Sequence, residues 1–177
     1  MVSKTMEFIP LPTQGEVLLQ IILAVIFGLL LGVERTIAGK TAGMRTFALV
    51  SLGSCLFVIV SVFVSVQNYT NFDFDPLRVA SNIVTGIGFL GAGLIIMKEN
   101  HLRGLTTAAG LWVAAGIGMA VGFRLYLIAF YTTLLTLAVF TILWFLKERI
   151  KSWPHRRYSQ NGPATSSPAE SAEAEEE

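Results

Sequence analysis

The sequence predicts an all-α, polytopic membrane protein with five transmembrane helices. First, the 177 residues are 53% hydrophobic and only 14% charged. Second, the charged residues gather in short clusters between long apolar runs, whereas a soluble domain distributes charge along the chain to build a surface. Third, the chain holds five apolar runs of about 17 to 22 residues, each able to cross a hydrocarbon core about 30 Å thick at about 1.5 Å per residue.

The first transmembrane helix is expected at residues 17–33, after an external N-terminal lead at residues 1–16. The lead is acidic and carries prolines rather than a basic segment, and no small-residue cleavage site follows the apolar run. We therefore interpret the run as a retained helix and not as a signal peptide. Gly28 and Gly32 form a GxxxG pair, which is typical of close helix packing in membranes.

The second helix is expected at residues 45–66, after a short basic loop rich in small residues. Pro76 follows a polar, acidic segment and stands at a natural helix start, so the third helix is expected at residues 77–97. A short charged turn at residues 98–103 follows it.

The fourth helix is expected at residues 104–121, where Gly110 and Gly118 recur with other small residues at four-residue spacing. The fifth, at residues 125–146, is the most uniformly bulky. The remaining residues, 147–177, are basic at first and then polar and acidic with few apolar residues, so we expect a disordered cytoplasmic tail.

The distribution of lysine and arginine predicts the orientation in the membrane. With five spans, ten of these residues fall on the side of the carboxyl terminus and three on the other side. Basic residues favour the cytoplasmic side. The amino terminus is therefore expected outside and the carboxyl terminus in the cytoplasm.

The third helix combines polar residues in its first turns with a run of glycines. Arg78, Asn82 and Thr85 come first, and a glycine set follows at Gly86, Gly88, Gly91 and Gly93. These glycines either allow a neighbouring helix to pack closely or mark a break in a helix that lines a site. The string GIGFLG also matches a dinucleotide-binding fingerprint, but the strand, helix and acidic residue that this fingerprint needs are missing.

The polar residues of this helix each have two interpretations. Arg78 either extends to the membrane interface or forms an ion pair, for which Asp75 is the nearest carboxylate. Asn82 lies one turn deeper and is expected to form hydrogen bonds either with another helix or with a ligand.

A second polar cluster is expected at the cytoplasmic ends of the first two helices. Glu34 and Arg35 end the first apolar run, and Arg45 opens the second. A carboxylate with two guanidinium groups around a loop of small residues is a candidate latch or anion site. Charged residues of this kind are also common wherever a membrane helix ends beside lipid headgroups, without any specific site.

Nothing in the sequence indicates an enzyme or a nucleic-acid-binding protein. No nucleophile has a histidine base, no catalytic carboxylates are paired and no phosphate loop is present, so no catalytic residue is predicted. No metal site and no cofactor is predicted either, because within the spans a Mg²⁺ ion would find few side-chain oxygens, mainly Asn82 and hydroxyl groups. The single Cys55 excludes a disulfide framework within the chain.

Four motifs in order resemble the MgtC/SapB family. They are Gly32-Val33-Glu34-Arg35, Lys40 to Thr46, Ile83 to Gly93, and Gly104 to Trp112, and the similarity covers about Gly28 to Tyr126. The resemblance implies a five-helix protein of the bacterial inner membrane with an external amino terminus. It also implies a link to magnesium homeostasis and to adaptation to acid or low magnesium.

Founding members of that family are similar to regulators that inhibit the F-type ATP synthase and affect phosphate uptake, although the family is often labelled as magnesium transport. Those members carry a folded cytoplasmic domain after the fifth helix. Here a basic segment and an acidic tail stand in its place, so roles that need the folded domain are not carried over.

Two functions remain open at this point. One is a non-enzymatic regulator that docks its helices onto a membrane complex such as the F-type ATP synthase. The other is a transporter or channel for an ion or small anion, Mg²⁺ or phosphate, along the polar side of the third helix. A homo-oligomer in the lipid bilayer is compatible with either.

Overall fold

The computed structural model describes residues 12–67, 75–98 and 101–151, with side chains described as far as residue 142. Five helices and one two-stranded hairpin make up this part of the chain, which confirms the five-helix, all-α prediction. In order they are α1 (Gln14–Ile37), α2 (Met44–Gln67), α3 (Pro76–Leu94), β1 (Ile96–Lys98), β2 (His101–Arg103), α4 (Leu105–Gly122) and α5 (Tyr126–Lys151). The first four helices are long and apolar enough to cross a membrane, and the described apolar part of α5, Tyr126–Ile142, is shorter.

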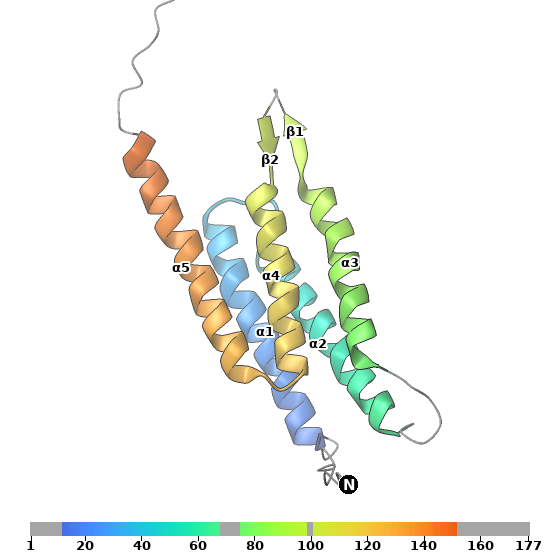
Figure 1. Cartoon of the computed structure of the whole chain (residues 1–177). Helices are drawn as coiled ribbons and strands as arrows, with labels where there is room; N and C mark the ends of the chain where they lie inside the picture. Colours follow the sequence, from blue (N-terminus) through green and yellow to red (C-terminus); the bar gives the residue numbers. More distant parts are fainter. Residues whose placement is uncertain (1–11, 68–74, 99–100, 152–177) are drawn as a thin grey trace, which may run out of the picture.

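Helix α4 is the centre of the bundle and packs against each of the other four helices. Helices α1 and α2 pack against it and against each other, while α3 and α5 flank this trio at opposite edges (Figure 1). The loop between α1 and α2 lies at the same end of the bundle as the β1–β2 hairpin, which we call the hairpin end. The turn between α4 and α5 lies at the other end.

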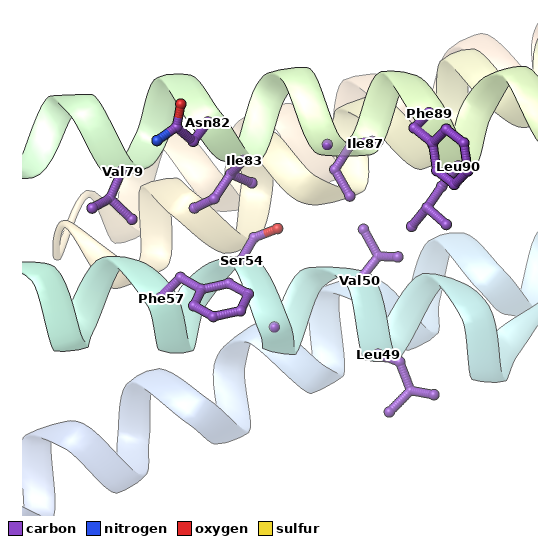
Figure 2. A pocket seen from close by; sticks show the side chains of 12 residues that line it. Leu49, Val50, Ser54, Phe57, Val79, Asn82, Ile83, Ile87, Phe89 and Leu90 are labelled. Atoms are coloured by element: carbon purple, nitrogen blue, oxygen red, sulfur yellow. The ribbon is translucent and has the colours of Figure 1, made fainter.

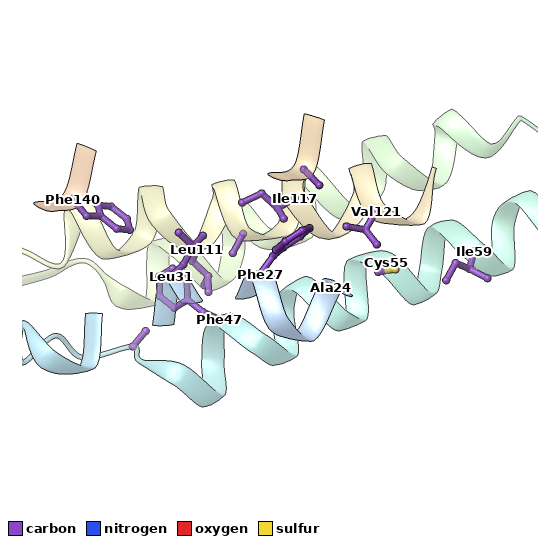
Figure 3. Close-up of a cluster of buried hydrophobic side chains, with 13 residues drawn as sticks. Ala24, Phe27, Leu31, Phe47, Cys55, Ile59, Leu111, Ile117, Val121 and Phe140 are labelled. Carbon is purple, nitrogen blue, oxygen red and sulfur yellow. The ribbon is translucent and has the colours of Figure 1, made fainter. Parts of the chain in front are cut away.

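The buried core lies between α1, α2 and α4, with α5 closing one side (Figure 3). Its large apolar side chains are Phe27, Leu31, Phe47, Ile59, Leu111, Ile117, Val121 and Phe140. In a bilayer, contacts of this kind stabilise a bundle through close packing, because lipid tails are as apolar as the side chains.

Glycines bring the core helices close together. A Cβ on Gly28 would lie 2.7 Å from the carbonyl oxygen of Phe47, and one on Gly32 would lie 2.5 Å from the Cα of Met44. A Cβ on Gly118 would overlap the backbone of Ser51. The α1–α2 and α2–α4 contacts therefore need a hydrogen atom at these positions.

Helix α1 begins earlier than the apolar run suggests. The Thr13 hydroxyl accepts a hydrogen bond from the Glu16 N–H at 3.3 Å, and the Glu16 carboxylate accepts one from the Thr13 N–H at 2.8 Å. This reciprocal capping box satisfies two backbone donors at the helix start. The helix consequently includes Gln14 to Glu16, which were expected in the lead.

Helix α1 also ends later, at Ile37, so that Glu34 and Arg35 lie in its last turns. The Thr36 hydroxyl donates to the Gly32 carbonyl at 2.9 Å and accepts from the Met44 N–H at 3.1 Å. This one side chain therefore joins the end of α1 to the start of α2.

Helix α3 is continuous but ends at Leu94, three residues before its expected end. The expected charged turn is instead an antiparallel hairpin in which Ile96 pairs with Arg103 and Lys98 with His101. Gly104 closes the hairpin with φ = 91°, where a Cβ would overlap the Leu94 carbonyl. Only glycine adopts this conformation at such a close approach without strain.

Helix α5 continues to Lys151, five residues beyond the expected end of the fifth helix. The first basic residues of the expected tail, at positions 147–151, are therefore helical. The rest of the tail and the lead at residues 1–11 lie outside the described residues.

Candidate functional site

One face of α3 turns away from the bundle. Arg78, Asn82, Thr85, Phe89 and Gly93 recur at spacings of three and four residues, which places them within about 80° of one another around the helix. We call these five residues the outer stripe. On the opposite side, Ile87 and Gly91 are the buried residues of α3.

Every residue of the outer stripe is exposed, and Phe89 has 82% of its surface accessible. Of the apolar stretch of α3 that could span a membrane, 11% is buried against the rest of the chain. The corresponding share of α4 is 56%. In Figure 2 the Asn82 amide points away from α2, whereas Val79, Ile83 and Ile87 point toward it. The chain therefore buries the apolar side of α3 and leaves its polar side uncovered.

The two polar side chains at the centre of the stripe differ in their hydrogen bonds. The Thr85 hydroxyl donates to the Ser81 carbonyl of its own helix at 3.2 Å. Within the described residues the Asn82 amide has no such partner. Asn82 lies six residues after Pro76, about 9 Å along the helix from its start.

Three of the four glycines in α3 border this uncovered side. Within the described residues, nothing lies within 4 Å of a Cβ built on Gly86, Gly88 or Gly93. A Cβ on Gly91 would instead contact the Cβ of Ala108 in α4 at 3.7 Å. The structure thus brings Gly91 to a helix contact and leaves the other three on a smooth, open surface.

A groove of about 600 Å³ runs between α2 and α3. Its lining is almost entirely apolar, from side chains such as Val50, Phe57 and Ile83. Ser54 and Asn82 are its polar lining residues, and the Asn82 amide points away from α2. Two such groups do not form a set of oxygen ligands for a hard cation. Among the described residues, no three His, Cys, Asp or Glu side chains gather where they could hold a metal ion.

Arg78 begins the outer stripe near the end of the bundle opposite the hairpin. The Asp75 carboxylate accepts a hydrogen bond from the Leu77 N–H at 2.9 Å and so caps α3. Within the described residues no ion pair joins Asp75 to Arg78. The Arg78 side chain is exposed.

The cluster at the hairpin end is organised around Arg35, which is only 4% exposed. Its guanidinium group forms two hydrogen bonds with the neighbouring Glu34 carboxylate, one of them from Nη2 to Oε1 at 2.7 Å. The same group lies over the Phe140 ring at 3.7 Å. The cation–π contact connects α1 to α5, while the ion pair lies within α1 and holds the guanidinium group in place.

Arg45 does not join this cluster, since its side chain is exposed at the start of α2. Phe140 was not among the residues expected from sequence. Its ring lies against Gly110, where a Cβ would be 2.6 Å from the Phe140 Cζ atom. No local sequence pattern predicts a contact between Gly110 and Phe140, which are 30 residues apart in the chain.

Gln20 was also missed, although its position gave a signal. It is a lone amide inside an apolar run, and such residues in membrane helices usually face the protein interior. Gln20 is 1% exposed, and its Nε2 donates to the carbonyls of Val121 and Gly122 at 3.0 and 2.9 Å. Gln20 thereby supplies hydrogen-bond donors to backbone carbonyls at the end of α4 that have no partner within that helix, and so it fixes α1 to α4.

These features define an integral membrane protein built as a bundle of five helices with one polar helix face uncovered. The chain belongs to the MgtC family, whose sequence profile matches residues 21–149. The resemblance expected from the four motifs is therefore confirmed.

The relatives include an Escherichia coli K12 protein named "Putative magnesium transporter YhiD", which is 42% identical over 138 residues, covering 77% of this chain and 64% of the relative. Protein SapB of Bacillus subtilis is 38% identical over 69% of this chain and 54% of its own length. Protein MgtC of Salmonella typhimurium is 38% identical over 77% of this chain and 56% of its own length. The chain thus spans less than two thirds of each of these relatives, and no solved structure matches it.

Proposed function

We propose that this protein is a non-enzymatic regulator of magnesium or ion homeostasis in the bacterial inner membrane. It acts by docking the outer stripe of α3 onto a membrane partner. The observation that carries the proposal is the uncovered Asn82 amide, which is exposed and points away from α2 (Figure 2). We place it at membrane depth because it lies about 9 Å along a helix long enough to span the membrane. The link to magnesium rests on the name of the E. coli relative.

The energetics of a bilayer favour a partner at this face. An amide in hydrocarbon has no water to bond with, and a hydrogen bond between membrane helices contributes about 0.6 to 2 kcal/mol. Each exposed glycine also lowers helix propensity by about 1 kcal/mol relative to alanine. Gly86, Gly88 and Gly93 make no compensating contact within the described chain, and a docked helix supplies one.

A partner complex such as the F-type ATP synthase, which the family resemblance suggests, fits this mode of action. The site needs a helix that presents a hydrogen-bonding group opposite Asn82 and a side chain that covers the glycines. A copy of the same chain is another occupant with these properties. Both involve the same face of α3.

The proposal is tested by combining growth at limiting Mg²⁺ with flux measurements on the purified chain. A strain lacking the gene is complemented with the wild type, with Asn82→Leu, with Gly86→Leu, or with the control Gly116→Leu. Gly116 is a matched control because nothing lies within 4 Å of its Cβ position either. We expect both α3 variants to lose complementation while the control retains it.

In liposomes, the wild-type chain is expected to give no flux of Mg²⁺, K⁺, H⁺ or phosphate above empty vesicles. Flux that Asn82→Leu abolishes would instead establish the transporter function. The groove between α2 and α3 makes transport the second candidate, because Asn82 and Ser54 lie along it. Its apolar lining argues against a path for a hydrated cation.

A further inference from the structure

The β1–β2 hairpin has two chemically different sides. The register pairs Met97 with Leu102 on one side, and it pairs Ile96 with Arg103 and Lys98 with His101 on the other. Successive residues of a strand point to opposite faces, so the first side is purely apolar and the second carries the basic side chains. All six residues are exposed, including Met97 at 68% and Leu102 at 62%.

The helix lengths place this hairpin at the depth of the lipid headgroups. Helix α3 has 19 residues and α4 has 18, which at about 1.5 Å per residue match a hydrocarbon core of about 30 Å. Both helices meet the hairpin directly at one end of the bundle (Figure 1). Strands of three residues add about 10 Å, so the hairpin crosses a headgroup layer that is about 5 to 8 Å thick.

The charge at this end of the bundle complements an anionic surface. Lys98 and Arg103 are exposed on the hairpin, and Lys40 and Arg45 are exposed around the neighbouring start of α2. The sequence also has Glu99 between the two strands, outside the described residues. These four basic residues and one acidic residue together carry a net charge of +3.

We propose that the hairpin is a binding element for anionic phospholipid headgroups. Met97 and Leu102 lie against lipid on the apolar side, while Lys98 and Arg103 contact lipid phosphates from the other side. An amphipathic element with apolar and basic sides binds an interface in this way. The hairpin would thereby anchor the ends of α3 and α4 in one leaflet, independently of what covers the outer stripe.

The apolar side is tested by labelling single cysteines with an environment-sensitive dye. The full chain with Cys55→Ala carries Met97→Cys, Lys98→Cys, His101→Cys or Leu102→Cys in phosphatidylglycerol–phosphatidylcholine vesicles. Positions 97 and 102 are expected to resist quenching by aqueous iodide and to be quenched by brominated lipid. Positions 98 and 101 are expected to show the reverse. Equal accessibility at all four positions would overturn the proposal.

The basic side is tested by the lipid composition that co-purifies with the chain from mixed vesicles. Lys98→Gln with Arg103→Gln is expected to lower the preference for phosphatidylglycerol by roughly fivefold per charge, because a basic residue near an anionic membrane contributes about that factor. The control pair Lys40→Gln and Arg45→Gln is expected to have the smaller effect. Equal loss in both pairs, or displacement of the lipid by millimolar inorganic phosphate, would contradict a headgroup site on the hairpin.

Discussion

At several glycines, the absence of a Cβ atom allows two helices of this bundle to approach closely. Gly118 is the clearest case, because its position faces the backbone of Ser51 and not a flexible side chain. The backbone cannot move aside without shifting α2 as a whole. The GxxxG spacing in the sequence indicated that such positions exist, but it could not say which helix each one meets.

Gly118→Ala is therefore expected to destabilise the chain, while Gly116→Ala in the same helix is expected to be neutral or slightly stabilising. Overpacking costs about 1 to 3 kcal/mol, which in a protein of this size lowers Tm by roughly 2 to 12 °C. Thermal unfolding in one detergent measures both variants. A stable Gly118→Ala variant would show that α2 and α4 are not in close contact.

The Arg35 guanidinium is the second residue-scale feature, since it joins Glu34 beside it to Phe140 on another helix. A double-mutant cycle with Arg35→Met and Phe140→Leu is expected to give a coupling of about 1 to 2 kcal/mol, as for a desolvated cation–π pair. Unfolding of the two single variants and the double variant supplies the numbers. Additivity within about 0.5 kcal/mol would mean that the two side chains do not interact.

Among the elements, α3 is the one whose role depends on which of its sides is covered. The sequence identified its polar residues and glycines. It could not assign them to sides, because the buried stripe around Ile87 is set by packing on α2 and α4. The hairpin was missed for a related reason: six residues of mixed polarity carry no reliable period, and the left-handed Gly104 that closes the hairpin is identified only from the backbone.

A pair of substitutions in α3 separates its two sides. Gly91→Leu is expected to force α3 away from Ala108 and to lower stability by about 1 to 3 kcal/mol, because the Leu side chain overfills an existing contact. Gly93→Leu is expected to leave the stability of the isolated chain almost unchanged, since its surroundings are open. Chemical unfolding of both variants is the measurement. Equal stability of the two would refute the assigned orientation of α3.

At the scale of the whole molecule, the number and type of helices followed from the apolar runs, because a bilayer imposes a minimum length on each span. The positions of the helix ends were predicted less accurately from the sequence. The Thr13–Glu16 capping box lengthens α1 at its start, and no apolar residue marks that extension. The bundle order, with α4 at its centre, depends on contacts between distant residues that no local pattern encodes.

The proposed orientation has its own test. In a Cys55→Ala chain in intact cells, Gly15→Cys is expected to react with a membrane-impermeant maleimide. Lys40→Cys is expected to react only after the cells are broken. Both positions are exposed and lie near opposite ends of α1. Labelling of position 40 in intact cells would place the amino terminus in the cytoplasm.

The most direct test of the docking function is photo-crosslinking from the outer stripe in native membranes. Phe89 is replaced by p-benzoylphenylalanine, and Leu135 on α5, also exposed at 66%, is the control. We expect position 89 to yield a discrete protein adduct that Asn82→Leu abolishes, and position 135 to yield lipid adducts. Lipid adducts alone at both positions would show that no protein covers this face of α3, and docking would be wrong.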